Sequence, residues 1–506
     1  MPSRASGTRP GPPRPWPPWP CATRQERQTY RAHRPYPAHR ACRRRRAWPC
    51  PKGDRSPVRA PAARRAGRRR TGLRWFPEPC PRSSCDRRPA VKCSRGSAHG
   101  RLRLRRRTVA AAAAALLALP AAAGTAYAGP TPAPSPVPTP TRAAPAPDDD
   151  FPLLSPAVAR QLDAAVQKVM REANVPGVTV SLSAPGKGNY VKSFGVADKA
   201  TRQPMTTDMY VRIGSETKTF TVTALLRLVD QGKLSVDDPI SQYIDGVPNG
   251  DRIHLRDLAD MRSGLFNYSE DADFDKAFLS NPNTLFTPQQ LLDYSFKHPV
   301  QFQPGEKFEY SNTNLILLGL VVEKVSGLPL HEYIERHVLE PAGLRRTLFP
   351  TGAEFPQPHP QGYTNQTASG KVAISTNWDP SWAWAAGAII SDLKDLRSWA
   401  RTVATGTLLT PATQAERLRT LPTGIPGAGY GMGIFDIQGW IGHNGSLPGY
   451  ETLTIYLPGP QATLVVLLNT DILYDKVIEP STLFGQAITQ IVTPDHVFNL
   501  PVPTPR

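Results

Sequence analysis

The six cysteines of this chain are confined to its first fifth. They lie between Cys21 and Cys93, and the remaining 413 residues contain none. Charge divides the chain near the same point. Of the 61 basic and 41 acidic residues, 31 and 4 precede Gly129, which gives +27 before that residue; the 30 basic and 37 acidic residues after it give −7. The second part therefore cannot rely on disulfides, so buried apolar surface has to hold it together.

Residues 1–100 are rich in Arg and Pro and show no apolar repeat of 2 or 3.6 residues. Such a segment cannot bury enough surface to offset the entropy of ordering, so we predict a disordered leader.

Two alternatives remain for this leader. It could be a basic arm that binds nucleic acid, as the consecutive Arg residues at 43–46 suggest, or a framework held by disulfides or zinc. The cysteine spacings form no Cys-x2-Cys pair and bring no His at ligand distance, which disfavours zinc.

Residues 101–128 match an export signal. Arg residues between 101 and 107 precede the apolar run 109–123, and Ala126 and Ala128 are the small residues that a signal peptidase recognises. The run is too short for a permanent transmembrane helix, and no Cys follows it for lipid attachment. We therefore expect cleavage near Ala128 and release into the extracellular or cell-wall space, with no stable membrane anchor and no nucleic-acid partner.

The signal lies far from Met1, and the next methionine is Met170. An export signal placed so deep in a chain is hard to use. We therefore hypothesise that translation begins at a non-Met codon near Val91 and that residues 1–90 result from an incorrectly assigned gene start.

Residues 129–150 alternate Pro with Ala, Thr and Ser, which favours an extended polyproline II linker without a core. Residues 151–500 are enough for one large α/β domain or two closely packed subdomains.

Apolar residues spaced four apart over 157–173 predict an amphipathic helix at the start of this domain. Strand-like runs flank Pro-containing turns in two places, 178–182 with 190–194 and 452–457 with 462–468.

The middle of this domain, from Thr219 to about Arg401, consists mainly of helical segments separated by loops. Each end of the domain supplies one hairpin. We therefore predict an α/β fold in which an antiparallel sheet is built from both chain ends, is flanked by helices, and carries a mainly helical inserted subdomain.

Ser215 and Lys218 begin one of these helices, after Gly214. Because they are three positions apart, they share one face at the helix N-terminus. Free backbone N–H groups and the positive end of the helix dipole favour an oxyanion there, and an amine one turn away can orient or deprotonate the serine hydroxyl. The other Ser-x-x-Lys, Ser391 to Lys394, also opens a helix, so we interpret Ser391 as an N-cap.

Tyr310 and Asn312 follow a Pro-Gly turn and precede an apolar stretch, which puts them in a loop or at a helix entrance. A tyrosine whose pKa is lowered by neighbouring cations can act as a general base, and an Asn amide can hold a substrate carbonyl. A turn tyrosine and an Asn cap are the structural alternatives. The segment Tyr363-Thr364-Asn365 is a rival with the same pattern.

His443, Asn444, Gly445 and Ser446 stand just before a predicted strand. A strand edge that faces the nucleophile can donate a backbone N–H to an oxyanion hole, with Gly445 permitting close approach of the substrate. A lone histidine is more often structural, but its position after the other two motifs favours a role in the site.

Three motifs together resemble the active-site motifs of the serine β-lactamase and penicillin-recognising family: Ser215-x-x-Lys218, Tyr310-x-Asn312 and His443-x-Gly445. The resemblance is to the branch that contains class C β-lactamases and soluble D-alanyl-D-alanine carboxypeptidases. Four side stretches agree with it, namely 195–198, 226–234, 262–265 and 381–388. The similarity covers residues from 151 to the C-terminus and none of 1–150, and it implies a β-lactamase/transpeptidase-like fold.

For catalysis, the resemblance implies that Ser215 attacks a carbonyl and forms an acyl-enzyme that water hydrolyses. Lys218 and Tyr310 would shuttle the proton, and the choice of base stays open. His443 stands where a lysine is more usual. The resemblance implies neither a metal nor a cofactor.

For the substrate, the resemblance implies that Asn312 binds the acyl side and that the backbone N–H of Ser446, beside Gly445, completes the oxyanion hole with that of the nucleophile. Trp382, one of three tryptophans between 378 and 384, can supply an apolar wall. Core packing is the alternative use of these tryptophans.

One departure from the family concerns the substrate. Carboxypeptidases of this type keep basic residues after a Gly-Tyr-Gly-x-Gly segment, where they meet the terminal carboxylate, but Phe435 and Asp436 stand there in this chain. An acidic side chain at that place would repel a carboxylate. Carboxylate recognition is therefore open.

Three functions follow for the 151–500 domain, which we expect to be a monomer. The first is a D-alanyl-D-alanine carboxypeptidase or β-lactamase that acts on a peptidoglycan peptide or another small molecule. The second is an esterase or amidase of substrates without a carboxylate. The third is a non-catalytic penicillin- or peptidoglycan-binding module, which the intact set of Ser215, Lys218 and Tyr310 disfavours.

Overall fold

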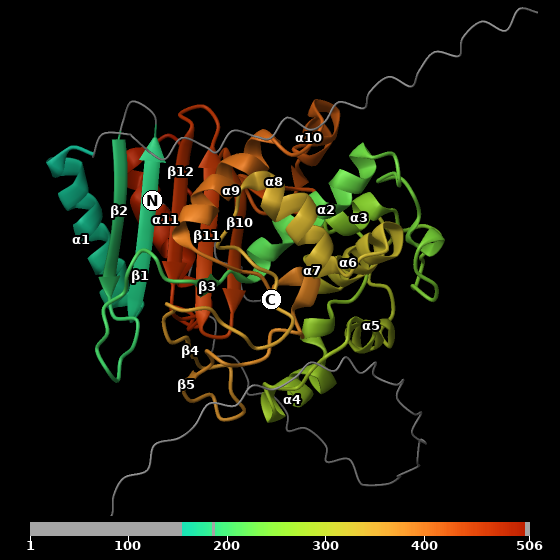
Figure 1. Ribbon diagram of the computed structural model, residues 1–506, viewed down its shortest axis with the longest axis horizontal. Helices are drawn as coiled ribbons and strands as arrows, with labels where there is room; N and C mark the ends of the chain where they lie inside the picture. Colours follow the sequence, from blue (N-terminus) through green and yellow to red (C-terminus); the bar gives the residue numbers. More distant parts are fainter. Residues whose placement is uncertain (1–153, 185–187, 501–506) are drawn as a thin grey trace, which may run out of the picture. The chain divides into compact units, whose positions relative to one another are not determined.

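The computed structural model describes residues 154–184 and 188–500 (Figure 1). The predicted leader at 1–100, the export signal at 101–128 and the linker at 129–150 lie outside the described residues, as does the proposed start near Val91. These parts of the domain organisation therefore stay predictions.

An eight-stranded sheet forms the centre of the described part, in the order β2-β1-β12-β11-β10-β9-β8-β7. Its first two strands are β1 (Gly177–Ala184) and β2 (Gly188–Gly195), and the others come from the end of the chain: β7 (Leu421–Pro422), β8 (Ala428–Gly431), β9 (Ile434–Ile437), β10 (Trp440–Leu447), β11 (Tyr450–Leu457) and β12 (Ala462–Leu468). Antiparallel pairing of β1 with β12, with Val180 opposite Val466, joins the two groups. Figure 1 shows them side by side as blue-green and red strands. The prediction of a sheet built from both chain ends is confirmed.

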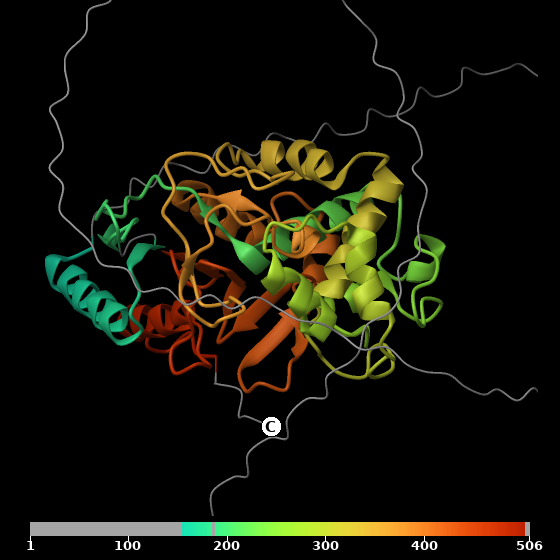
Figure 2. The ribbon, with the colours of Figure 1, turned by 90° about the horizontal axis from the view of Figure 1, so that it is seen from below.

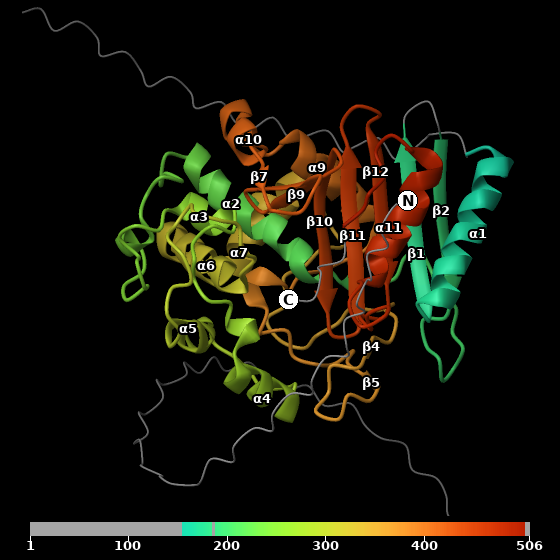
Figure 3. The same ribbon diagram turned by 180° about the vertical axis from the view of Figure 1, so that it is seen from behind.

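Helices cover both faces of this sheet. On one face lie α1 (Pro156–Glu172) and α11 (Pro480–Val492), which pack side by side (Figures 2 and 3). On the other face lies α9 (Leu393–Thr405), in front of the strands in Figure 1. Because both faces are covered, every residue of β11 and β12 is buried. The core between the sheet and the first pair of helices includes Leu162 and Phe484, both without exposed surface.

The predicted helical insert occupies the space beside β10. Its helices are α2 (Thr217–Asp230), α3 (Leu255–Ala259), α4 (Ala272–Ser280), α5 (Pro288–Phe296), α6 (Asn312–Ser326), α7 (Leu330–Ile334) and α8 (Glu340–Ala342). One more helix, α10 (Pro411–Arg417), follows beyond the predicted end of the insert near Arg401. Two short ladders accompany them, β3 (Val211–Arg212) with β6 (Ile390–Ser391) and β4 (Tyr363–Thr364) with β5 (Ala373–Ile374). In the described part of the chain, no single helix has the length and apolarity to cross a membrane; α6 and the segment Leu330–Ala342, bent by 76°, meet that test only as a pair.

The interpretation of Ser391 as an N-cap is wrong by one residue. Asp392 caps α9, because its side chain accepts a hydrogen bond from the backbone N–H of Asp395 at 2.9 Å. Ser391 instead pairs with Val211 in the β3–β6 ladder, and its hydroxyl lies 2.8 Å from that of Thr347. The second Ser-x-x-Lys is therefore a buried strand end followed by a helix.

Candidate active site

Ser215 lies on a tight 3-10 turn, Gly214–Glu216, that leads directly into α2. The turn presses against β10. Gly214 has a φ of +52°, and a side chain there would place its Cβ 2.6 Å from the backbone nitrogen of Ser446. Only glycine tolerates both the dihedral angle and this approach. The backbone of Ser446 is thereby held next to the turn that carries the nucleophile, where an oxyanion hole is expected.

Gly445 also permits a close approach, here of another segment of the chain, and the predicted approach of a substrate stays a prediction. A Cβ at this position would stand 1.9 Å from the carbonyl oxygen of Ile213. What Gly445 admits is thus the chain segment that leads into the Ser215 turn. Its role is to bring β10 and the nucleophile together.

The amine of Lys218 reaches back to the nucleophile. Its Nζ lies 2.9 Å from Ser215 Oγ and donates a hydrogen bond to the carbonyl oxygen of Ala386 at 2.9 Å. The side chain is completely buried, and burial holds the pKa of Lys218 well below its usual range. A neutral amine at this distance can accept the proton of the serine hydroxyl.

Tyr310 faces the same pair from the loop before α6. The Nζ of Lys218 lies 4.8 Å from the centre of its ring. Burial raises the pKa of Tyr310, and the negative charge of Glu479 adds to the increase, which a hydrogen bond with Ser215 only partly offsets. The idea of a phenol whose pKa is lowered by cations is therefore wrong. Tyr310 stays protonated, which suits it to donate a proton rather than to start the reaction as a base.

His443, on β10, is buried behind these groups. Its Nε2 lies 3.2 Å from the hydroxyl of Tyr430, and its ring centre lies 6.2 Å from that of Tyr310. Burial lowers the pKa of His443 to about 3. The imidazole is therefore neutral near pH 7, and the position where the family more often has lysine carries no positive charge.

Asn312 is the first residue of α6. Its backbone N–H donates to Asn267 Oδ1 at 3.0 Å, and its side-chain amide donates to Ser269 Oγ at 3.1 Å. The loop at 266–271 that supplies both partners thus determines where the Asn312 amide lies.

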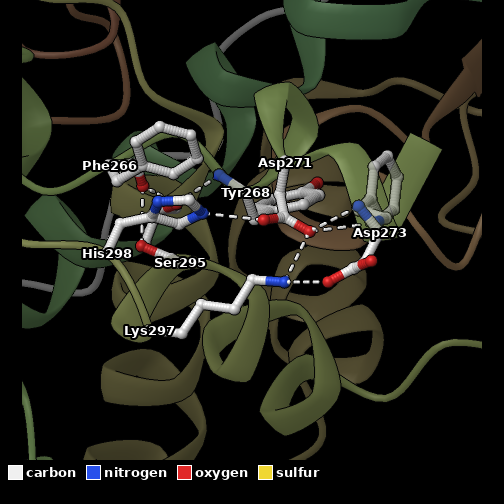
Figure 4. Close-up of polar contacts among 9 residues, drawn as sticks. Phe266, Tyr268, Asp271, Asp273, Ser295, Lys297 and His298 are labelled. Carbon is white, nitrogen blue, oxygen red and sulfur yellow. Dashed lines mark hydrogen bonds and ion pairs between the residues drawn. The ribbon is translucent and has the colours of Figure 1, made fainter. Parts of the chain in front are cut away.

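A buried carboxylate fixes this loop (Figure 4). Asp271 accepts hydrogen bonds from His298 at 2.7 Å and forms an ion pair with Lys297 at 2.9 Å. The ring of His298 stacks on Phe266, with 3.8 Å between the ring centres. Burial alone would raise the pKa of Asp271, but the contacts with His298 and Lys297 lower it to about 2. The carboxylate is therefore charged at physiological pH and anchors the loop.

A cavity of about 380 Å³ opens over the nucleophile. Ser215 and Tyr310 line it, and the rest of its lining consists of Phe308, Ile425, Phe435, Asn444, Ser446, Val477, Ile478, Glu479, Thr482 and Leu500. The walls are thus mainly apolar. No Lys or Arg is among the described residues that line the cavity, and Glu479 contributes a carboxyl group.

Of the four predicted substrate-binding residues, Ser446 lines the cavity, whereas Asn312, Gly445 and Trp382 do not. Trp382 does not line the cavity; it packs on Phe278, with 5.2 Å between ring centres, because it belongs to the core of the helical subdomain. Phe435 does line the cavity. The neighbouring Asp436 turns away from it and accepts a hydrogen bond from the backbone N–H of Gly439 at 2.9 Å. The rival Tyr363 is engaged with Asp198 and the backbone of Lys199, away from Ser215.

Sequence reasoning missed Glu479. The acid stands just before Pro480 as the N-cap residue of α11, a helix that packs on the far side of β11. A Glu-Pro pair at a helix start is a visible signal of the helix boundary. Its proximity to Ser215 depends on how α11 docks, which no local pattern shows. Within the described ranges, no group of three or more His, Cys, Asp or Glu residues is placed to hold a metal ion.

A sequence model of a family described as beta-lactamase matches residues 162–480. The chain is 29% identical over 284 residues to PbpX of Bacillus subtilis (strain 168), whose name assigns it to the penicillin-binding proteins; the alignment covers 55% of this chain and 66% of that protein. The chain thus spans slightly less than two thirds of this relative's length.

Two solved structures are similar over nearly their whole length. One is a D-stereospecific amidohydrolase from Streptomyces sp., with 30% identity and a TM-score of 0.58 over 66% of this chain and 97% of that chain. The other is the D-amino acid amidase from Ochrobactrum anthropi SV3 in complex with D-phenylalanine, with 27% identity and a TM-score of 0.59 over 66% of this chain and 99% of that chain.

Proposed function

Because this chain belongs to the beta-lactamase family, whose members include serine hydrolases, we propose that it is a hydrolase that forms an acyl-enzyme on Ser215. The neutral amine of Lys218 takes the hydroxyl proton as Ser215 Oγ bonds to the carbonyl carbon of the substrate. The oxygen of the tetrahedral intermediate accepts hydrogen bonds from the backbone N–H groups of Ser215 and Ser446.

The second half of the cycle returns the proton. The bond to the leaving group breaks as Tyr310 donates its phenolic proton to that group, and the phenol regains a proton from the ammonium of Lys218. Water then attacks the ester on Ser215 and gives one proton to the neutral amine. The bond between Ser215 Oγ and the acyl carbon breaks, the ammonium of Lys218 returns that proton to Oγ, and the acid is released. Each proton taken from Ser215 or from water is thus returned to a product or to Ser215.

For the substrate, we propose amides or esters that lack a free carboxylate next to the scissile bond. The charge of the site supports this choice. The described lining of the cavity contains no Lys or Arg, His443 is neutral, and Glu479 contributes a carboxyl group and no positive charge. The apolar walls formed by Phe308 and Phe435 suit a small hydrophobic group. Amide hydrolysis is also the activity named for the two similar solved structures.

Two experiments test this proposal, namely covalent labelling of Ser215 and a comparison of hydrolysis rates over a panel of substrates. A neutral alkyl fluorophosphonate should label the protein on Ser215, and Ser215→Ala should abolish labelling, whereas Ser391→Ala should retain it. Amino acid amides and short esters should be hydrolysed faster than D-Ala-D-Ala peptides or a chromogenic cephalosporin. Labelling without turnover of any substrate would support the non-catalytic binding module instead. Preference for the D-Ala-D-Ala peptide would support the carboxypeptidase function. Secretion after Ala128 and a monomeric state stay parts of the proposal.

A further inference from the structure

Glu479 alone, among the described residues that line the cavity, carries an ionisable carboxyl group. It shares the cavity with Ser215, although it comes from the start of α11 and not from the three motifs. The proposed cycle assigns it no role. A partly buried carboxyl group inside an otherwise apolar cavity has a desolvation cost, so it calls for a function.

The position of this carboxyl group is fixed from one side. Asn444, which stands two residues before Ser446 on β10, donates a hydrogen bond from Nδ2 to Glu479 Oε2. The hydrogen-bond partner of Glu479 is thus a neutral amide, which orients the carboxyl group without supplying a positive charge.

A second buried acid lies close to Glu479. Glu451, on β11, is completely buried, and its Oε2 accepts a hydrogen bond from the backbone N–H of Ser481 at 2.9 Å. Burial raises the pKa of both Glu451 and Glu479, and the negative charge of Glu479 raises that of Glu451 further. A positive charge placed in the cavity would lower the pKa of Glu479 again and favour its ionised form.

The walls of the cavity also suit a cation. Phe308 and Phe435 both line it, and aromatic faces attract a positively charged nitrogen. A volume of about 380 Å³ is large enough for a small amino acid derivative. The cavity thus combines an oriented acid, aromatic walls and a nucleophile.

We propose that Glu479 selects substrates that carry a positively charged nitrogen, which its carboxylate binds in the cavity while Ser215 attacks the neighbouring carbonyl. This inference rests on the proposed hydrolase function and narrows its substrate class to cationic amides or esters. Glu479 is a specificity residue and takes no part in the proton transfers.

The experiment uses two pairs of substrates of matched size. In the first pair the charge is on the acyl side, with phenylalanine p-nitroanilide compared with 3-phenylpropionyl p-nitroanilide, and both enantiomers of the amino acid are used. In the second pair the charge is on the leaving group, with the choline ester of 3-phenylpropionic acid compared with its 3,3-dimethylbutyl ester. The pair that responds shows which end of the substrate Glu479 contacts.

The wild type should prefer the cationic member of at least one pair by about tenfold to a hundredfold in kcat/KM, the usual effect of one charge-assisted hydrogen bond. Glu479→Gln keeps the shape and an acceptor for Asn444, and it should bring that ratio close to one. The matched control is Asp436→Asn, which removes an acid at the β9–β10 turn outside the cavity and should preserve the ratio.

Two results would overturn the inference while the proposed function stands. One is equal hydrolysis of both members of both pairs by the wild type, and the other is an unchanged ratio in the Glu479→Gln variant. Failure of the proposed function has a different signature, namely no labelling of Ser215 and no turnover of any of the four substrates, and the inference then fails with it.

Discussion

The amine of Lys218 and the hydroxyl oxygen of Ser215 lie 2.9 Å apart, with the amine completely buried. Burial keeps the pKa of Lys218 well below its usual range. The other candidate for the base, Tyr310, is less suitable because burial raises its pKa. The geometry therefore favours the amine as the group that activates the nucleophile.

Replacement of Lys218 by arginine tests this assignment. Arginine retains a long cationic side chain but does not lose its proton in proteins, so it cannot act as a base. We expect kcat/KM for an amide substrate to fall at least about a hundredfold, the typical contribution of a general base. Lys394→Arg, in the second Ser-x-x-Lys, is the control and should stay active. A fully active Lys218→Arg enzyme would transfer the role of base to another group.

Phe435→Arg should alter the choice between charged and neutral substrates. Because Phe435 lines the cavity, the new guanidinium would offer a carboxylate the cation that the site lacks. We expect kcat/KM for a carboxylate-bearing peptide, relative to its methyl ester, to rise about tenfold to a hundredfold. Asp436→Asn should change this ratio little, since that carboxylate is engaged with Gly439. If the wild type already prefers the free acid, unidentified groups bind the carboxylate.

Asp271→Asn should make the free energy of unfolding depend less on pH in the acidic range. The pKa of Asp271 falls from 3.8 to about 2 in the folded protein. Its stabilising effect is therefore complete above pH 3.8 and is lost as the pH falls through about 2, and it amounts to about 2 kcal/mol. Urea unfolding should show the wild type and the variant converging between pH 4 and pH 2. Asp251→Asn, at an exposed position, should follow the wild type. A constant difference across this range would contradict the charged anchor.

Glu216→Gln should change how stability depends on pH above about 4.5. Burial raises the pKa of Glu216 from 4.5 to about 8, so the folded protein holds a proton there that the unfolded chain releases. Stability should fall as the pH rises from about 4.5 to about 8, with a slope of at most about 1.4 kcal/mol per pH unit. The variant should lack this decline and exceed the wild type in its urea midpoint at pH 9. Parallel pH profiles would show that Glu216 does not titrate in this way.

The secreted protein should begin at Gly129. Ala126 and Ala128 fit the positions that a signal peptidase recognises. An intact-mass measurement of the protein recovered from the medium decides this. A mass that retains the Arg-rich leader would contradict both cleavage near Ala128 and the extracellular location.

Local patterns predicted the sheet and its hairpins well, because alternation and turn residues act over a few positions. The predicted strand at 462–468 coincides with β12, and the predicted helix at 157–173 differs from α1 by one residue. The three motifs were also found from spacing, and the structure brings Ser215, Lys218 and Tyr310 together. Their catalytic roles stay predictions.

Local patterns could not predict contacts between segments that are far apart in the sequence. Glu479 borders the nucleophile because α11 docks beside β11, and Trp382 is drawn into the core of the helical subdomain by its aromatic neighbours. The pKa of Tyr310 likewise depends on burial that only the assembled fold provides. The error at Ser391 was smaller, because both Ser and Asp are good N-caps and adjacent positions compete.

The contact between Gly214 and Ser446 has a consequence for how the chain is synthesised. The two positions come from opposite halves of the domain. Likewise, β1 pairs with β12, which is synthesised much later. A nascent chain that has passed Ser215 but not β10 therefore lacks the Ser446 backbone that lies beside the Gly214 turn, and closing so long a loop is slow. Ser215 is thus synthesised early, and under the proposed function it would gain its oxyanion hole only after the C-terminal strands are in place.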